Sequence, residues 1–93
     1  MIHIDEQTRE VLLITQEECA EVTQAVSKVF RFGFDSRWPN KDSPSNKEQL
    51  EEELGDLLAM IDILVEKCII SDSNVNKARK MKKTKLEKWS DIK

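Results

Sequence analysis

The sequence predicts an all-α fold of three main helices, in which two copies of the chain together complete a four-helix-bundle core. Charged residues make up 35% and apolar residues 39% of the chain, with only two Gly and two Pro, a composition typical of helical proteins. Apolar residues recur at helical spacing, and no segment alternates convincingly as a strand does. Because 93 residues bury only a thin core, we expect residues 1–93 to be a single domain that forms a homodimer or a dimer of dimers.

The first predicted helix begins after Asp5, which is a favourable N-cap residue, and ends at Phe32. Gly33 then supplies the conformational freedom that often closes a helix. Residues 33–47 hold both prolines and several small polar residues, a composition that predicts a loop. The expected buried stripe of this helix consists of Val11, Ile14, Val22, Ala25, Val26 and Val29.

The second helix is predicted from a capping box, Ser45-x-x-Glu48, to about Ile70. The segment SDSN at 71–74 breaks it and caps a third helix, from about Asn74 to Trp89. The expected buried stripe of the second helix is Leu50, Leu54, Leu57, Leu58, Ile61, Leu64 and Val65. The expected inward face of the third is Val75, Ala78, Lys82, Leu86 and Trp89.

Acidic residues interrupt the apolar stripes of the first two helices. Glu18 lies near the centre of the first stripe with Glu21 on its flank, and Glu53 and Asp56 lie at the edge of the second. Residues three apart project from one side of a helix, so each pair could share a ligand. An acid pair of this kind is most often a solvated helix flank, but two pairs on consecutive helices favour a functional site. Gly55, costly inside a helix by about 1 kcal/mol, is expected to make room beside Asp56.

Four carboxylates gathered without a cation would repel one another and lose hydration. Neither stripe offers a compensating Lys or Arg. A hard divalent cation resolves the conflict, and oxygen ligands favour Mg²⁺, with Mn²⁺ as an alternative. The one histidine of the chain, His3, lies outside this region, which argues against a zinc site.

The segments EECAEV and EEELGDLL resemble the ExxE…ExxD signature of the MazG-like, all-α nucleoside triphosphate pyrophosphohydrolases. The resemblance extends over roughly residues 8–90 and includes Gly55 before Asp56, the Leu57-Leu58 pair and a basic third helix. Thirty-one residues separate Glu21 from Glu53, a long spacing for this family, and the excess lies in the loop.

The resemblance implies Mg²⁺-dependent hydrolysis of a (d)NTP to a nucleoside monophosphate and pyrophosphate. It implies that Glu18, Glu21, Glu53 and Asp56 are metal ligands. Glu21 is our choice for the general base, because one carboxylate that is not fully used in coordination could take a proton from water.

The third helix supplies candidate phosphate contacts. Residues 74–93 carry eight Lys or Arg against two acidic residues, although the whole chain has a net charge of −3. Lys82 lies on the expected inward face, flanked by Lys85 and Arg79, and these three are candidate substrate-binding residues. An inward Lys whose head snorkels to solvent is the simpler alternative.

Two residues near the loop are further candidate substrate contacts. Trp38 stands in a polar loop, where it either closes over the core or stacks on a base. Arg31 could face the ligand, although VFRFGF could equally be an apolar helix end.

Two other functions stay open at this stage. One is a phosphoribosyl-ATP pyrophosphohydrolase, and the other is a non-catalytic helical dimerisation module whose basic tail binds nucleic acid. The preferred interpretation is an enzyme whose partners are a nucleotide substrate and further copies of itself, with no nucleic acid. No apolar run reaches the roughly 18 residues of a membrane span, so we expect a cytoplasmic protein without a membrane partner.

Overall fold

The computed structural model describes residues 3–92. These residues form three helices and no strand: α1 (Glu6–Phe32), α2 (Asn46–Glu66) and α3 (Asp72–Trp89). The prediction of an all-α chain with three helices is therefore confirmed. By compactness the chain divides into two units, one ending at Ile63 and the other beginning at Leu64. None of the described helices combines the length and apolar character needed to cross a membrane.

Helix α1 begins and ends where the sequence predicts. One carboxylate oxygen of Asp5 accepts a hydrogen bond from the backbone N–H of Thr8 at 2.8 Å, which satisfies a free donor of the first turn. Gly33 follows the helix with a φ of 87°, and its N–H donates to the carbonyl of Val29 at 2.8 Å. A left-handed backbone at this position favours glycine, so the predicted C-terminal signal is confirmed.

Helix α2 is held at its start by the predicted capping box. The Ser45 hydroxyl accepts from the backbone N–H of Glu48 at 3.1 Å, and the Glu48 carboxylate accepts from the N–H of Ser45 at 3.0 Å. Hydrogen bonds to the Glu48 carboxylate from the backbone and the side chain of Ser45, followed by the charge of Arg37 in an ion pair at 3.0 Å, lower the pKa of Glu48. The reciprocal bonds fix residue 46 as the first of the helix.

The other end of α2 differs from the prediction. The helix stops at Glu66 rather than near Ile70. Cys68 adopts a left-handed φ of 59°, and the N–H groups of residues 68, 69 and 70 turn back to the carbonyls of Val65 and Leu64. These bonds satisfy the last carbonyls of the helix without glycine. Helix α3 then begins at Asp72, two residues earlier than expected, because Ser71 caps it by accepting from the N–H of Asn74 at 3.3 Å.

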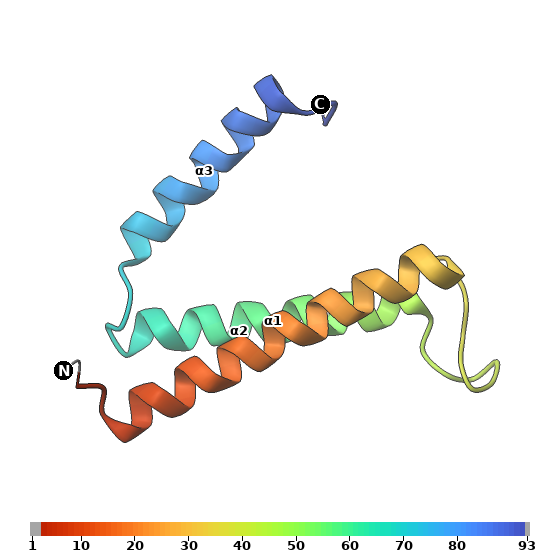
Figure 1. Ribbon diagram of the computed structural model, residues 1–93, viewed down its shortest axis with the longest axis horizontal. Helices are drawn as coiled ribbons and strands as arrows, with labels where there is room; N and C mark the ends of the chain where they lie inside the picture. The colour runs from red at the N-terminus through yellow and green to blue at the C-terminus, as the bar shows by residue number, and fades with distance from the viewer. Residues whose placement is uncertain (1–2, 93) are drawn as a thin grey trace. The chain divides into compact units, whose positions relative to one another are not determined.

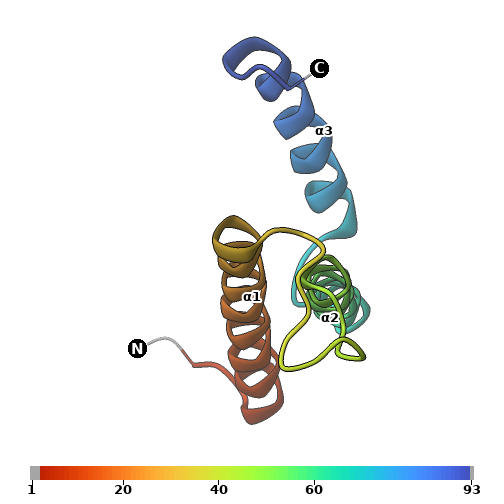
Figure 2. The ribbon, with the colours of Figure 1, turned by 90° about the vertical axis from the view of Figure 1, so that its right-hand side faces the viewer.

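Helices α1 and α2 lie side by side as an antiparallel hairpin joined by the loop 34–45 (Figures 1 and 2). The loop contains one isolated antiparallel bridge, between Arg37 and Ser45. The Asn46 side chain is buried and donates to the carbonyls of Gly33 at 2.9 Å and Lys28 at 3.5 Å. The end of α1 is thereby tied directly to the start of α2.

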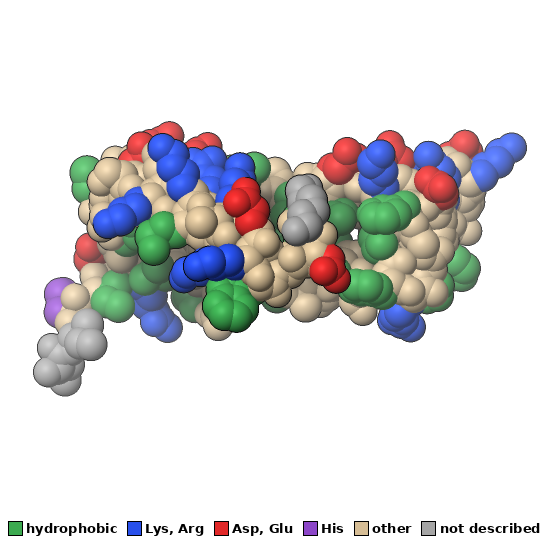
Figure 3. Space-filling model, turned by 90° about the horizontal axis from the view of Figure 1, so that it is seen from above, with side chains coloured by type: hydrophobic (Ala, Val, Ile, Leu, Met, Phe, Trp, Pro, Cys, Tyr) green, Lys and Arg blue, Asp and Glu red, His purple; other side chains and the backbone are tan. Residues whose placement is uncertain are grey.

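The core of the described chain is thin. Its buried apolar residues are Val11, Ala25, Met60 and Leu64, and no side chain is less than 2% exposed. Hydrophobic side chains stand at the surface among charged ones (Figure 3). Several belong to the predicted stripes of α1 and α2, with exposed fractions of 37% for Val26, 42% for Leu54 and 61% for Leu58. The stripes are therefore only partly covered by the chain itself.

The predicted inward face of α3 is largely exposed in the described chain, and its burial against another element or another copy stays a prediction. None of its residues is buried, Lys82 and Ala78 are exposed, and Trp89 is 82% exposed. Only Val75 and Leu86 of the expected face are half-buried. The periodic pattern identifies an apolar stripe correctly, but a stripe is buried only where another element covers it.

Candidate metal centre

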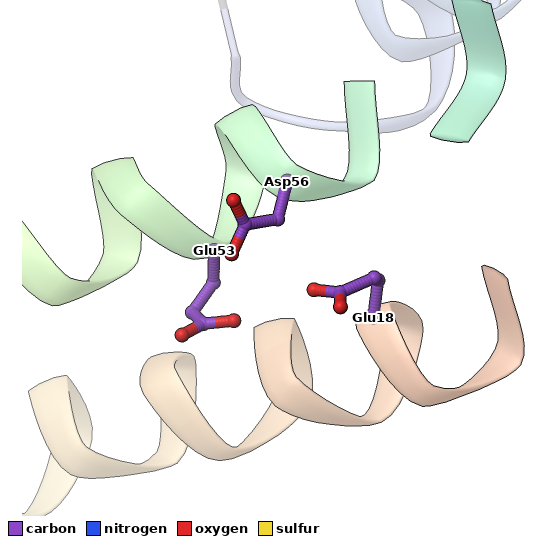
Figure 4. Close-up of side chains that lie close together, drawn as sticks. All are labelled: Glu18, Glu53 and Asp56. Carbon is purple, nitrogen blue, oxygen red and sulfur yellow. The ribbon is translucent and has the colours of Figure 1, made fainter. Parts of the chain in front are cut away.

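Three of the four predicted acidic ligands come together between α1 and α2. Glu18 projects from the middle of α1 toward Glu53 and Asp56, which lie almost one turn apart on α2 (Figure 4). One carboxylate oxygen from each residue belongs to a group whose members all lie within 4.8 Å of one another. This convergence follows from the antiparallel hairpin, because it sets the middle of one helix against the middle of the next.

Glu18 is the most constrained member of the group. Its side chain is half-buried, and its Oε2 atom is buried without a hydrogen-bond partner. Burial raises the pKa of Glu18, and the charges of Asp56, Glu21 and Glu17 raise it further. Buried carboxylate oxygens normally have partners, so this oxygen is available to accept from a donor or to bind a cation.

Glu53 shares this environment. Burial raises its pKa, and the nearby charges of Glu21, Asp56, Glu18 and Glu52 add to the effect in that order. The only ion pair among residues 3–92 joins Arg37 to Glu48, so no basic side chain neutralises the group. Repulsion and partial desolvation therefore act together on these carboxylates.

Glu21 lies outside the group of three. Its side chain is exposed, yet its charge contributes to the raised pKa values of both Glu18 and Glu53. Glu21 is thus an electrostatic neighbour of the centre. Its predicted roles as fourth ligand and as general base stay predictions.

Gly55 does not act as expected within the chain. A methyl group built at this position would meet no atom within 4 Å, so Gly55 faces open space. The expectation that Gly55 makes room in a pocket between the two helices is therefore wrong for contacts inside the described hairpin. The space it leaves would matter only to something that approaches α2 from outside.

The residues of this centre suit a hard divalent cation. Three carboxylates from two helices can supply oxygen ligands, the type that Mg²⁺ and Mn²⁺ prefer. A bound cation would also satisfy the unpartnered oxygen of Glu18 and offset the mutual repulsion. The donor set contains neither His nor Cys, so zinc fits it poorly.

Three of the predicted substrate contacts belong to the second unit, and Arg31 lies at the end of α1 in the first. Arg79, Lys82 and Lys85 are exposed on α3, in the second unit, and the Arg79 guanidinium donates to the Asn76 side chain. Arg31 is exposed, with its guanidinium carbon 5.0 Å from the centre of the Phe32 ring. Their roles in substrate binding stay predictions.

Trp38 does not close over the core. Its side chain is 80% exposed and lines a pocket between the end of α1, the loop and the start of α2. The sequence did not single out Lys28 and Gln49, which line the same pocket and lie 3.5 Å apart, Nζ to Oε1. Their spacing could have identified them, since they stand seven residues after Glu21 and four before Glu53.

A sequence model of the MazG nucleotide pyrophosphohydrolase domain matches residues 6–84, which include all four predicted acidic ligands. Neither a curated protein nor a solved structure matches the chain significantly. The family match extends over both compact units and confirms the resemblance seen in the acidic motifs.

Proposed function

Because this chain belongs to the MazG nucleotide pyrophosphohydrolase domain family, we propose that it hydrolyses a (d)NTP to the monophosphate and pyrophosphate with the help of Mg²⁺. The family's enzymes are nucleotide pyrophosphohydrolases that generally depend on a divalent metal. The observation that carries the proposal is the group of Glu18, Glu53 and Asp56, with its unpartnered buried oxygen. A cluster of this kind serves no evident structural purpose, because nothing in the described chain pairs with it.

In this proposal Glu18, Glu53 and Asp56 hold Mg²⁺, or Mn²⁺ in its place, and Glu21 is the fourth ligand. When bound, the cation neutralises phosphate charge and lowers the pKa of a water molecule. Glu21 is the proposed general base, because it is exposed beside the three clustered carboxylates. It would take a proton from the water that attacks the α-phosphorus, while the pyrophosphate group leaves.

The basic side chains of α3 are the proposed grip on the triphosphate. Arg79, Lys82 and Lys85 are exposed and form no ion pair with a carboxylate among the described residues. Their positive charges are therefore available to phosphate oxygens, which Lys binds as a point charge and Arg through its planar fork. Arg31, at the end of α1, is a further proposed contact.

We also propose that the active protein is a homo-oligomer with a four-helix core, as a dimer or a dimer of dimers. The support is the incomplete cover of α1 and α2, where Phe30 is 86% and Leu58 61% exposed. Such surfaces on one chain are explained when a second copy packs against them.

The test of the reaction uses purified protein with Mg²⁺ and a panel of NTPs and dNTPs, followed by identification of every phosphorus-containing product. We expect equal amounts of monophosphate and pyrophosphate, and no turnover when a chelator removes the metal. Glu53→Gln should be inactive in the same assay, which excludes a contaminating phosphatase. Release of orthophosphate and a diphosphate would overturn the proposal.

A further inference from the structure

A pocket lies beside the carboxylate centre within the first unit. It has a volume of about 150 Å³ and opens between the last turns of α1, the loop and the first turn of α2. It is lined by Lys28, Phe32, Ser36, Trp38, Asn46 and Gln49. None of these residues is needed for the proposed metal centre, and only Trp38 attracted attention in the sequence.

The pocket and the carboxylates share one face of the hairpin. On α2, Gln49, Glu53 and Asp56 follow at intervals of four and three residues, and on α1 Lys28 stands seven residues beyond Glu21. These intervals keep side chains on the same side of a helix. With a rise of 1.5 Å per residue, Gln49 lies about 6 Å along the axis from Glu53, and Lys28 about 10 Å from Glu21. Glu18, the member of the centre on α1, lies ten residues or about 15 Å along the axis from Lys28, so the pocket is one to three turns from the centre.

The walls of the pocket combine two rings with polar groups. Trp38 is 80% exposed, so its ring is accessible to a planar ligand, whereas Phe32 is 59% exposed and has the Arg31 guanidinium over one face of its ring. Lys28 Nζ lies 3.5 Å from Gln49 Oε1, and Gln49 Nε2 donates to the Pro44 carbonyl at 3.3 Å. Bases stack on aromatic side chains irrespective of sequence, and amides or ammonium groups can bind the polar edge of a base.

The volume of the pocket limits the size of the ring that it can bind. A protein cavity of about 150 Å³ holds one benzene molecule, whereas sites for whole drug-sized ligands run to about 300–1,000 Å³. A pocket of this size has room for one six-membered ring, and the sugar and phosphates would extend beyond it. Since Glu53 and Asp56 lie one to two turns from Gln49 on the same face of α2, a nucleotide could place its ring in the pocket and its phosphates at the centre.

We propose that this pocket binds the base of the substrate and that it favours a pyrimidine. This inference rests on the proposed function, because it identifies the pocket as the base subsite of the same reaction. Trp38 stacks on the ring, and Lys28 and Gln49 face its polar edge. Trp38 is then exposed because its ring is the surface that a bound base would cover.

Binding can be tested without catalysis. The chain has two tryptophans, so Trp89→Phe leaves Trp38 as the sole indole reporter. We expect CMP and UMP, added without a divalent metal, to change the fluorescence of this variant saturably. Ribose 5-phosphate, which lacks a base, should leave it unchanged. A response equal to that of ribose 5-phosphate, or tighter binding of AMP and GMP than of CMP and UMP, would overturn the inference.

Kinetics provide the second arm. Removal of a stacking aromatic costs roughly 1–3 kcal/mol per base, so Trp38→Ala should raise KM for a pyrimidine triphosphate roughly 5- to 150-fold with little change in kcat. Trp38→Phe should restore part of the lost affinity, because a phenyl ring can still stack on a base. A purely structural role of Trp38 does not predict this recovery of KM. Lys41→Ala, an exposed loop position outside the pocket, is the matched control and should behave as wild type.

The two proposals fail in different ways. If wild-type protein hydrolyses nucleotides and Trp38→Ala keeps the wild-type KM, the pocket assignment is wrong and the reaction stands. If Trp38 fluorescence responds to CMP and UMP but no triphosphate is hydrolysed, the reaction is wrong and the pocket binds pyrimidine nucleotides for another purpose.

Discussion

Glu18 and Glu53 face one another across the α1–α2 hairpin with carboxylate oxygens no more than 4.8 Å apart, and neither is paired with a basic side chain among residues 3–92. Two negative charges at this separation raise the free energy of the folded chain at neutral pH, because partial burial reduces the solvent that would screen them. Such an arrangement is expected only where the free energy of binding a ligand outweighs this electrostatic cost. The first two predictions follow from it.

Substitution of a clustered acid should separate activity from stability. Glu53→Gln and Asp56→Asn each keep the shape of the side chain and remove a charge, so divalent-dependent hydrolysis should fall by at least 100-fold, in line with the loss of a metal ligand. Relief of repulsion should leave the melting temperature of the metal-free protein equal or higher. Steady-state hydrolysis and thermal denaturation followed by circular dichroism measure the two effects.

The control is Glu51→Gln, an exposed acid on the same helix outside the cluster, which should retain wild-type activity. Full activity of either clustered variant would remove that residue from the centre, and loss of helix content in both would assign the acids a structural role.

The stability of the metal-free protein should depend on pH with a definite sign. The pKa values of Glu18 and Glu53 are raised above the usual 4.5, so the folded chain binds protons more tightly than the unfolded chain. Stability is therefore greatest when these groups are protonated, and it falls as pH rises from about 4.5 through the raised pKa values. Saturating Mg²⁺ should reduce this loss at neutral pH, because it binds only the folded form.

Melting temperatures measured from about pH 5 to pH 8, with and without Mg²⁺, test this dependence. Glu18→Gln removes one of the titrating groups and should flatten the metal-free curve. A wild-type curve that rises with pH in this window would contradict the prediction.

The capping box of α2 should contribute measurably to folding. Ser45→Ala removes the hydroxyl that accepts from the N–H of Glu48, and loss of such a cap costs about 0.5–2 kcal/mol. Urea denaturation should show a lower midpoint with an unchanged slope. Ser27→Ala, at an exposed position of α1, is the comparison and should change stability by no more than about 0.5 kcal/mol. Equal stabilities of the two variants would show that the cap contributes little.

The lysines of α3 distinguish the enzyme from a nucleic-acid binder. If α3 grips the triphosphate, Lys82→Ala should raise KM or lower kcat by about tenfold, and replacement of Lys80, Lys83 and Lys88 with Gln should change hydrolysis little. Lys82 is exposed, as are the other three lysines, so the comparison is between residues of one kind in similar surroundings. If α3 binds nucleic acid, each neutralised lysine should lower the salt slope of binding by about one.

Hydrolysis and DNA binding are measured on both variants. Wild-type hydrolysis by Lys82→Ala, together with loss of DNA binding by the triple variant, would favour the nucleic-acid binder.

Assembly should depend on the exposed apolar face of the hairpin. Light scattering at micromolar concentration should report a dimer or a larger species for the wild type. Leu58 is 61% exposed on α2, and Leu58→Lys should shift the population toward the monomer, since an unpaired charge would enter an apolar interface. Glu52→Lys, on a different face of the same helix, should leave the assembly intact. A fully active wild-type monomer would contradict the proposed oligomer.

The sequence predicted those helix ends that depend on hydrogen bonds between residues close together in the chain. Asp5 with Thr8, Gly33 with Val29, and Ser45 with Glu48 form the bonds that the sequence predicts. Each depends on the chemistry of one residue and a neighbour three or four positions away. These signals therefore fixed both ends of α1 and the start of α2.

The misplaced boundary at Glu66 has a local cause that composition does not reveal. Apolar residues continue to Ile70, so periodicity alone extends α2, but a non-glycine residue, Cys68, takes the left-handed conformation that ends it. The inward assignment of Lys82 stays a prediction, since Lys82 is exposed in the single chain. Periodicity shows that α3 has an apolar stripe but not that the same chain covers it.

The sequence predicted the acidic residues of the candidate site but did not predict the pocket beside them. Four acids at i, i+3 spacing are a pattern within single helices, and the hairpin then joined three of them. The pocket instead depends on how the loop places Trp38 against Lys28 and Gln49. Loop geometry is set by turns and contacts that no periodic pattern encodes, so a sequence can suggest such a residue without locating its neighbours.

Asn46 has a consequence for how this protein can diversify. Its buried side chain joins the carbonyls of Gly33 and Lys28, and so it fastens the two helices together at the base of the loop. Lengthening or replacing residues 37–43 would leave that fastening, and the spacing of the carboxylates beyond it, in place. Selection can therefore exchange the exposed surface of this loop, Trp38 included, while the carboxylates keep their positions. A loop transplanted between relatives that share this asparagine would replace Trp38 and leave the other residues that line the pocket unchanged.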